Sequence, residues 1–477
     1  MSSESKKYKK LAVNTAVFAV GSFGAKFLSF FLVRLYTGVM SEAQFGQADI
    51  IQQTVNILYP LLTLASADAV IRFGIDKAYD NSKVLSGALL ITLAGLFVFA
   101  LASPALLAID EFYGFTFLIY ACAMFSCLRQ IAASFCRARG YVKLFAADGI
   151  IATLTMVLFN VLFLVVLNLG VQGFVLSIIC SDILSVVFLT GFGGFVKYLD
   201  FSKVSRKFLR EMIKYSLPLV PAYLLWWITS ASDRWFVLNI TGAAANGVYS
   251  AAYKVPGLLV MMTTLFYQAW QMSAIENKDE RDLADFFGKV YDNYSSLLFI
   301  GAAGLIMICR PVNAVLLDSS PEKGFNEAYR FTAVLVIATV FQCCCQFLSS
   351  IYNVKNKSVN SMLTSGLAAG ANLILNAVLI PPLGALGAAA ATAISYALCF
   401  ISRLADTHRM IRFKMHILRF LINTALVSFA CFALYVNLFG FAWAFTIGVF
   451  VIICLINLKS LFGIFYILIK RLNRKTA

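Results

Sequence analysis

Residues 136–160 read CRARGYVKLFAADGIIATLTMVLFN, a short basic stretch that leads into a long apolar run. Residues 352–376 read YNVKNKSVNSMLTSGLAAGANLILN and follow the same order 216 positions later. Both segments end on an asparagine, Asn160 and Asn376. The two segments therefore indicate an internal repeat.

A second pair of segments follows the first pair directly. LGVQGFVLSIICS at 169–181 matches LGALGAAAATAIS at 383–395, with Gly-x-x-Gly and a later serine at corresponding positions. We infer that six helices are repeated as six more helices in the same orientation. Parallel six-helix repeats are typical of secondary transporters, whose two halves rock around a central site, although small residues at helix contacts can produce a similar pattern by chance.

The composition around these repeats is that of an integral membrane protein. Of the 477 residues, 61% are hydrophobic and 13% are charged, against roughly 45–50% and about 25% in soluble domains. Apolar runs recur from Leu11 to Lys470, and each approaches the roughly 20 residues that a helix needs to cross a bilayer. The runs lack the alternation of barrel strands, so we predict an all-α fold with about 14 transmembrane helices.

The distribution of basic residues predicts the orientation. Of the 39 Lys and Arg residues, 30 fall in connections that are cytoplasmic if the N-terminus is cytoplasmic, as the positive-inside rule requires. The net charge of +16 therefore reflects topology and contacts with anionic membrane lipids, and we expect no nucleic-acid partner. We expect a multi-pass protein of the cytoplasmic membrane with both termini in the cytoplasm.

The predicted spans divide the chain into three regions. An N-lobe of helices 1–6 covers residues 1–205, a C-lobe of helices 7–12 covers 206–415, and two extra helices with a basic cytoplasmic tail cover 416–477. No connection exceeds about twenty residues, so the sequence predicts no soluble domain. Three of the spans, each read as one helix, are 48–72, 247–275 and 289–317.

Residues 216–259 read SLPLVPAYLLWWITSASDRWFVLNITGAAANGVYSAAYKVPGLL and contain the most specific motifs of the chain. These motifs are the prolines Pro218 and Pro221, Ser-Asp-Arg at 232–234, Gly247-x-Tyr249-Ser250 and Tyr253-Lys254-x-Pro256. With the pattern of the first helix, which includes Asn14-Thr15, Phe23-Gly24, Lys26 and Leu35-Tyr36-Thr37, they resemble the polysaccharide-transporter (Wzx-type) flippases of the multidrug/oligosaccharidyl-lipid/polysaccharide (MOP) exporter superfamily.

This resemblance implies a MATE-like fold and a specific activity. A Wzx-type flippase moves an undecaprenyl-pyrophosphate-linked oligosaccharide from the inner to the outer leaflet by alternating access between two lobes, for cell-surface polysaccharide biosynthesis. Other polysaccharide assembly proteins are then possible partners. The extra pair of helices resembles that of relatives that flip the lipid-linked peptidoglycan precursor, so this activity stays open as an alternative.

Several charged residues lie inside the predicted spans, where each costs about 2.5–3.5 kcal/mol on insertion scales. A pyrophosphate needs charge-assisted hydrogen bonds from Lys and Arg, so we take the intramembrane cations as substrate-binding candidates. Lys26 lies on a polar helix stripe with Ser22 and Ser29. It either contacts the pyrophosphate or pairs with a carboxylate, and the same choice applies to the others. The substrate-binding candidates are Lys26, Arg34, Arg129, Arg234 and Lys254.

Coupling of transport to H⁺ or Na⁺ requires a group that takes up the ion, and an intramembrane carboxylate is suited to this role. The candidates are Asp182, Asp68 and Asp233, and each could instead neutralise a neighbouring cation. We expect no other cofactor. The cysteines form no Cys-x-x-Cys pair, so we expect no metal site.

Two other classes of function are alternatives to the flippase. A MATE-like drug or cation exporter would need a less cationic cavity. A membrane-embedded polysaccharide polymerase would need clustered acids and histidines or large outer loops, but both histidines, His408 and His416, lie in one basic loop. No catalytic motif is apparent, so we expect a transporter and not an enzyme.

Overall fold

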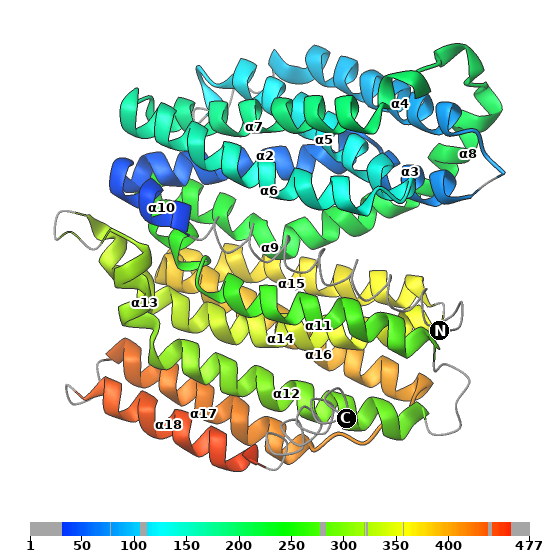
Figure 1. Ribbon diagram of the computed structural model, residues 1–477. Helices are drawn as coiled ribbons and strands as arrows, with labels where there is room; N and C mark the ends of the chain where they lie inside the picture. Colours follow the sequence, from blue (N-terminus) through cyan, green and yellow to red (C-terminus); the bar gives the residue numbers. More distant parts are fainter. Residues whose placement is uncertain are drawn as a thin grey trace, which may run out of the picture. The chain divides into compact units, whose positions relative to one another are not determined.

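The computed structural model contains only helices and connecting segments in the part of the chain that it describes (Figure 1). The described residues are 31–76, 78–104, 112–276, 283–318, 320, 323–355, 357–436 and 441–458. Within them, eight helices are long and apolar enough to cross a membrane, or up to ten if each of two bent pairs is one span. The all-α membrane fold is thus confirmed.

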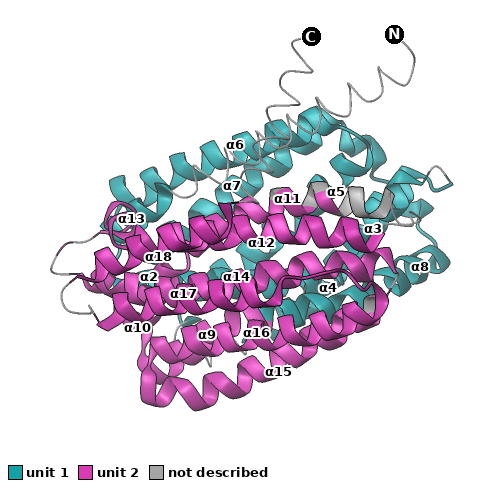
Figure 2. Cartoon of the chain, turned by 90° about the horizontal axis from the view of Figure 1, so that it is seen from below, with its two compact units in different colours: residues 1–227 teal, residues 228–477 magenta. Residues whose placement is uncertain are grey.

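The chain forms two compact units, residues 1–227 and 228–477 (Figure 2). The boundary lies inside a single helix, α9 (Val220–Thr241). The predicted division into lobes at residues 205 and 415 remains a prediction.

The described part of unit 1 begins with helical residues 31–39. It packs around a cluster of buried aromatic and aliphatic side chains that includes Phe73, Phe135, Phe208 and Met212. Its elements are α2 (Glu42–Leu62), α3 (Ser66–Ile75), α4 (Asn81–Ala102), α5 (Thr116–Ala138), α6 (Val142–Asn160) with its π-helical extension η3 (Val161–Val166), α7 (Gly170–Gly193), the short turns η4 (Phe195–Tyr198) and η5 (Phe201–Lys203), α8 (Arg206–Ser216), η6 (Leu217–Leu219) and the first part of α9.

Unit 2 has its own core, in which Trp270, Phe287 and Phe347 are buried together. Its elements after α9 are α10 (Ala243–Ala252), α11 (Pro256–Glu276), α12 (Leu283–Met307), α13 (Cys309–Leu316), η7 (Gly324–Glu327), α14 (Ala328–Val354), α15 (Ser358–Leu383), α16 (Ala385–Met410), α17 (Ile417–Val436) and α18 (Ala442–Ile456). The helix α18, in the described part of the last predicted span, is 15 residues long.

The Gly-x-x-Gly motifs of the repeat have the same structural role in both units. Gly170 and Gly384 have φ angles of 55° and 58°, a left-handed conformation that glycine adopts without steric cost. At Gly387 a Cβ would lie 2.1 Å from the carbonyl oxygen of Leu379, so only glycine allows the start of α16 to approach the end of α15 this closely. At Gly173 a Cβ would lie 3.0 Å from the carbonyl oxygen of Phe163, at the end of the preceding helix. The two motifs therefore build the same tight helix connection twice.

The three spans predicted as single helices, 48–72, 247–275 and 289–317, are each broken, which corrects the prediction. The first consists of α2 and α3, which meet at 51°, and the third of α12 and α13, which meet at 67°. The second stops after α10 and resumes at Pro256, the first residue of α11. Proline is common in the first turn of a helix, because the N–H that it lacks would have no partner within the helix there.

The break between α2 and α3 has a steric cause. Leu64 and Ala65 have positive φ angles of 46° and 53°, which no helix can contain. Gly95 of α4 lies against this break, and a Cβ on it would be 2.0 Å from the carbonyl oxygen of Leu62. The absence of a side chain at residue 95 thus lets α4 pack directly on the backbone at the C-terminal end of α2.

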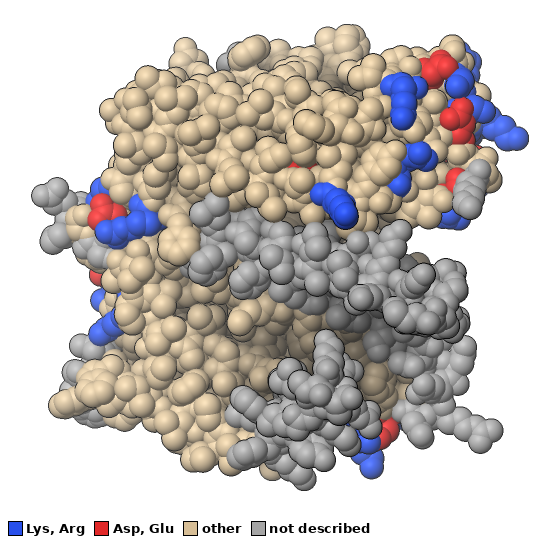
Figure 3. All heavy atoms as spheres, in the orientation of Figure 1, with Lys and Arg blue, Asp and Glu red and all other residues tan. Residues whose placement is uncertain are grey.

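One end of unit 1 carries most of its exposed basic residues. In Figure 3 blue side chains gather near α8 and the start of α4, whereas the visible flank of the unit is mostly uncharged. At this end the backbone N–H of Ser82 and the ammonium of Lys203 hold the pKa of Asp80 below its usual range. The exposed cations of this end are Arg72, Lys83, Arg137, Lys143, Lys197, Lys203, Arg206, Lys207, Arg210 and Lys214.

Candidate functional site

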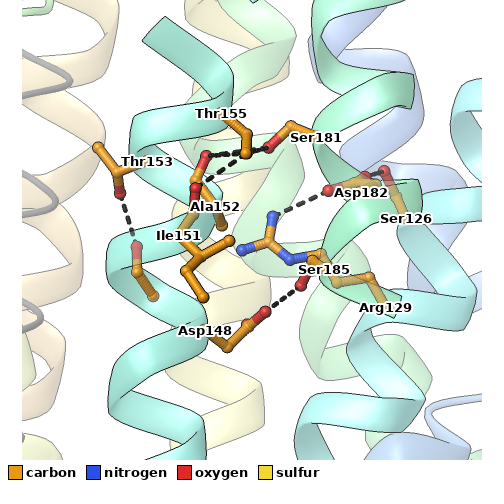
Figure 4. Close-up of polar contacts among 11 residues, drawn as sticks. Ser126, Arg129, Asp148, Ile151, Ala152, Thr153, Thr155, Ser181, Asp182 and Ser185 are labelled. Atoms are coloured by element: carbon orange, nitrogen blue, oxygen red, sulfur yellow. Dashed lines mark hydrogen bonds and ion pairs between the residues drawn. The ribbon is translucent and has the colours of Figure 1, made fainter. Parts of the chain in front are cut away.

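The polar interior of unit 1 joins two of the predicted site residues. A nitrogen of the Arg129 guanidinium on α5 lies 2.8 Å from Oδ1 of Asp182 on α7 (Figure 4). The hydroxyl of Ser126, one turn before Arg129, donates to the other oxygen of Asp182. The Asp182 side chain is only 4% exposed, against 30% for Arg129. Arg129 and Asp182, predicted as substrate contact and ion-coupling group, thus form a mostly buried ion pair.

A second carboxylate, Asp148 of α6, lies beside this pair. It is buried and accepts a hydrogen bond from the hydroxyl of Ser185, one turn after Asp182 on α7. In Figure 4 the Arg129 guanidinium lies between Asp148 and Asp182. Three helices therefore bring two carboxylates to one guanidinium.

These side chains line a cavity of about 340 Å³ inside unit 1. Its polar lining combines Asn56 and Tyr59 of α2 with the charged residues of α5, α6 and α7. The charged lining comprises one guanidinium, from Arg129, and two carboxyl groups, from Asp148 and Asp182. The cavity is therefore better suited to a cation than to a pyrophosphate.

A separate polar cluster lies in unit 2 around Asp233 of α9. Its carboxylate is fully buried and accepts hydrogen bonds from the hydroxyls of Tyr249 and Tyr253, both at 2.6 Å, and of Thr392 at 3.3 Å. The Thr392 hydroxyl also accepts from the amide of Asn372 at 3.5 Å. Asp233 thus has several oxygen-bearing neighbours from three other elements.

Arg234 follows Asp233 and is also buried. Its guanidinium stands 4.4 Å from the centre of the Tyr253 ring, a cation–π contact, and donates to the carbonyl of Ser230 at 2.9 Å. Arg234 and Asp233 thus share the partner Tyr253.

Lys254 is the half-buried second residue of the break between α10 and α11. Broken helices at membrane depth line cavities in transporters, because their free backbone groups need polar partners. Asp68 has a similar position in unit 1, in the first turn of α3 just after the break at Leu64, and it accepts from the hydroxyl of Tyr223 at 2.8 Å.

The two remaining substrate-binding candidates belong to the first predicted helix. Arg34 is exposed within the helical residues 31–39. Lys26 lies outside the described residues.

The family of the chain follows from its sequence. Residues 39–323 match the polysaccharide biosynthesis protein family. The chain belongs to this family. No curated protein matches the chain.

Several solved structures have a fold similar to that of this polysaccharide biosynthesis protein. The lipid II flippase MurJ, in an inward closed conformation, has 15% identity and a TM-score of 0.66, and the match covers 95% of this chain and 100% of MurJ. The Vibrio cholerae MATE transporter VcmN has 14% identity and a TM-score of 0.60, with 86% of this chain and 98% of VcmN covered. A multidrug resistance MATE transporter of the MOP superfamily, inward-facing, has 14% identity and a TM-score of 0.64, with 82% of this chain and 98% of that one covered. The fold of the family member described here is therefore that of MOP transporters.

Two features of this polysaccharide biosynthesis protein were not predicted as parts of a site. Asp148 is a lone acid in the sequence, and only the packing of α6 on α7 brings it to Arg129. Arg403 of α16 falls among the cations of a predicted cytoplasmic connection, yet it is 7% exposed and donates to Thr364 and Ser365 of α15 and to Cys345 of α14. Its position about five turns into a helix of mixed small and apolar residues was the available signal.

Proposed function

We propose that this protein is a flippase that moves an undecaprenyl-pyrophosphate-linked oligosaccharide from the inner to the outer leaflet of the cytoplasmic membrane by alternating access. Membership of the polysaccharide biosynthesis protein family and the MOP transporter fold support this proposal. In this proposal both termini are cytoplasmic, and the basic end of unit 1 faces the cytoplasm, as the positive-inside rule requires. The protein acts as a transporter and not as an enzyme.

The break between α10 and α11 is the observation that carries the proposal. It places the half-buried Lys254 in the connection between the two helices. Lys is a compact donor for phosphate oxygens. We therefore take Lys254 as the first contact to test for the pyrophosphate, together with Lys26, Arg34 and Arg234.

Transport in this proposal is coupled to H⁺ or Na⁺. Asp233 supports such coupling, because a buried carboxylate with Thr392, Asn372 and two tyrosine hydroxyls nearby offers several oxygen atoms to an ion. Asp182 supports it through the cavity of unit 1.

A second candidate function is the flipping of a lipid-linked peptidoglycan precursor. The likeness to the lipid II flippase favours it, because the match covers 95% of this chain. Both functions need a pyrophosphate site in the membrane, so the saccharide distinguishes them.

The experiment is the chemical identification of the lipid-linked saccharides that accumulate in cells depleted of this protein. Accumulation of an undecaprenyl-pyrophosphate oligosaccharide supports the proposal, whereas accumulation of a peptidoglycan precursor alone supports the second candidate. No accumulated intermediate and unchanged surface polysaccharide would contradict both.

The site is tested in the same cells with single variants of equal membrane abundance. Lys254→Ala and Lys26→Ala are each expected to restore the accumulation seen without the protein, and Lys254→Arg is the charge-conserving control. Full activity of Lys254→Ala would remove the break from the proposed site.

A further inference from the structure

The unit 1 cavity contains two carboxyl groups, Asp148 and Asp182, and one guanidinium, Arg129, so we asked which group balances the charge of Asp148. Arg129 is hydrogen-bonded to Asp182, and Asp148 is buried and accepts a hydrogen bond from the hydroxyl of Ser185. An ionised carboxylate without its own counter-ion is costly to bury. Asp148 must therefore either carry a proton or share Arg129 with Asp182.

Among the residues that the structure describes, the groups around Asp148 leave few other ways to balance its charge. Arg129 of α5 and Asp182 of α7 interact with it electrostatically, and so does Cys136 of α5. Tyr59 of α2 lines the same cavity. Among these groups only Arg129 carries a positive charge, and it is already bonded to Asp182.

We propose that Asp148 is a proton-binding residue, and that its protonation decides which carboxylate holds Arg129. In the arrangement of Figure 4 Asp148 carries the proton, the Ser185 hydroxyl bonds to it, and Arg129 pairs with Asp182. When Asp148 releases its proton to water in the cavity, its carboxylate competes for the guanidinium. Arg129 keeps its own protons throughout, and no covalent bond other than the O–H of Asp148 breaks.

The consequence of this exchange is mechanical. The Arg129–Asp182 contact joins α5 to α7, whereas an Arg129–Asp148 contact would join α5 to α6. A single proton thus selects which pair of helices the ion pair connects. This inference rests on the proposed function only where it identifies the proton as the coupling ion of the flippase, and the proton site itself is testable without substrate.

The test is an infrared pH titration of the purified full-length protein, which follows the carbonyl stretch of protonated carboxyl groups. The wild type is expected to show the band of one buried protonated carboxyl group that disappears as the pH rises, and Asp148→Asn is expected to lack this band. Asp68→Asn is the matched control, because Asp68 is an intramembrane acid outside this cavity, and it should keep the band. Identical titrations of the wild type and Asp148→Asn would overturn the proposal.

A second measurement covers the case in which Asp148→Asn unfolds. Arg129→Lys keeps the positive charge but not the fork that reaches two carboxylates, so the midpoint of the Asp148 band should shift. Ser185→Ala removes the hydroxyl partner of Asp148 and should also shift it. Unchanged midpoints in both folded variants would again overturn the proposal. Because this readout contains no lipid-linked saccharide, its failure leaves the flippase proposal intact, and failure of the depletion experiment leaves the proton site intact.

Discussion

The helices α5, α6 and α7 of unit 1 and α14, α15 and α16 of unit 2 are repeats of each other, yet they contain different charges. By the spacing of the repeat, Asp148 corresponds to Thr364, Asp182 to Tyr396 and Ser185 to Cys399. Unit 1 therefore has two carboxylates where unit 2 has an alcohol and a phenol.

Unit 2 instead contains a buried arginine from one turn further along α16. The Arg403 guanidinium donates to the Thr364 hydroxyl at 3.0 Å, to the Cys345 carbonyl at 2.9 Å and to the Ser365 hydroxyl at 2.6 Å. Cys345 is the counterpart of Arg129 by the same spacing. All these acceptors are neutral, so the charge of Arg403 is held without a carboxylate among them. The same helix triplet thus carries an arginine with two carboxyl groups in unit 1 and an arginine with neutral acceptors in unit 2.

The largest expected effect is that of Arg129→Leu, which tests the network of unit 1. Removing one partner of a buried pair leaves Asp182 uncompensated, which typically costs about 3–5 kcal/mol. We expect a clearly lower melting temperature of the purified protein. The double variant Arg129→Leu with Asp182→Leu should recover most of the loss, because replacing a whole buried pair is often nearly neutral. An equally low melting temperature in the double variant would contradict the pairing.

A smaller effect is expected for Arg403→Lys, which tests the fixed charge of unit 2. Lysine keeps the charge but cannot bond to acceptors on α14 and α15 together, and each buried acceptor left unsatisfied costs about 1–3 kcal/mol. The melting temperature should fall by less than in Arg129→Leu. The control is Arg409→Lys, at an exposed position near the end of α16. If Arg403→Lys melts like the wild type, the fork of Arg403 is not needed.

The smallest effect is expected for Thr364→Asp, which makes unit 2 resemble unit 1. The new carboxylate would stand beside Arg403, where the Thr364 hydroxyl accepts at 3.0 Å, so its burial is compensated. We expect a change in unfolding free energy within about 1 kcal/mol. The control Thr364→Asp with Arg403→Leu should be strongly destabilised. Equal stability of the single and double variants would mean that the new acid does not meet Arg403.

The sequence was sufficient for the helical membrane fold and for the repeat, because both depend on local signals. Apolar runs reveal spans, and the glycines at 170 and 384 reveal tight turns. The breaks were not predicted. Pro256 was recognised only as part of a motif, and nothing in the sequence around Leu64 and Ala65 indicates their left-handed backbone.

The site was predictable only in part. Arg129 and Asp182 were recognised as charges in the membrane, but their pairing depends on the packing of α5 against α7. Asp148 and Arg403 become meaningful only through neighbours that are distant in the sequence. A charged residue in a membrane helix can be recognised from the sequence, whereas the residue that it pairs with can be identified only from the structure.

The break at Leu64 and Ala65 has a consequence for how unit 1 responds to its surroundings. Two non-glycine residues in left-handed conformation cost roughly 1–2 kcal/mol each, and joining α2 and α3 into one straight helix would recover this energy. The bend therefore persists because neighbours such as Gly95 of α4 accommodate it, not because the local chain prefers it. The angle of 51° between α2 and α3 is thus set by packing. We expect a change in bilayer thickness or lateral pressure to alter this angle through the backbone of these two residues.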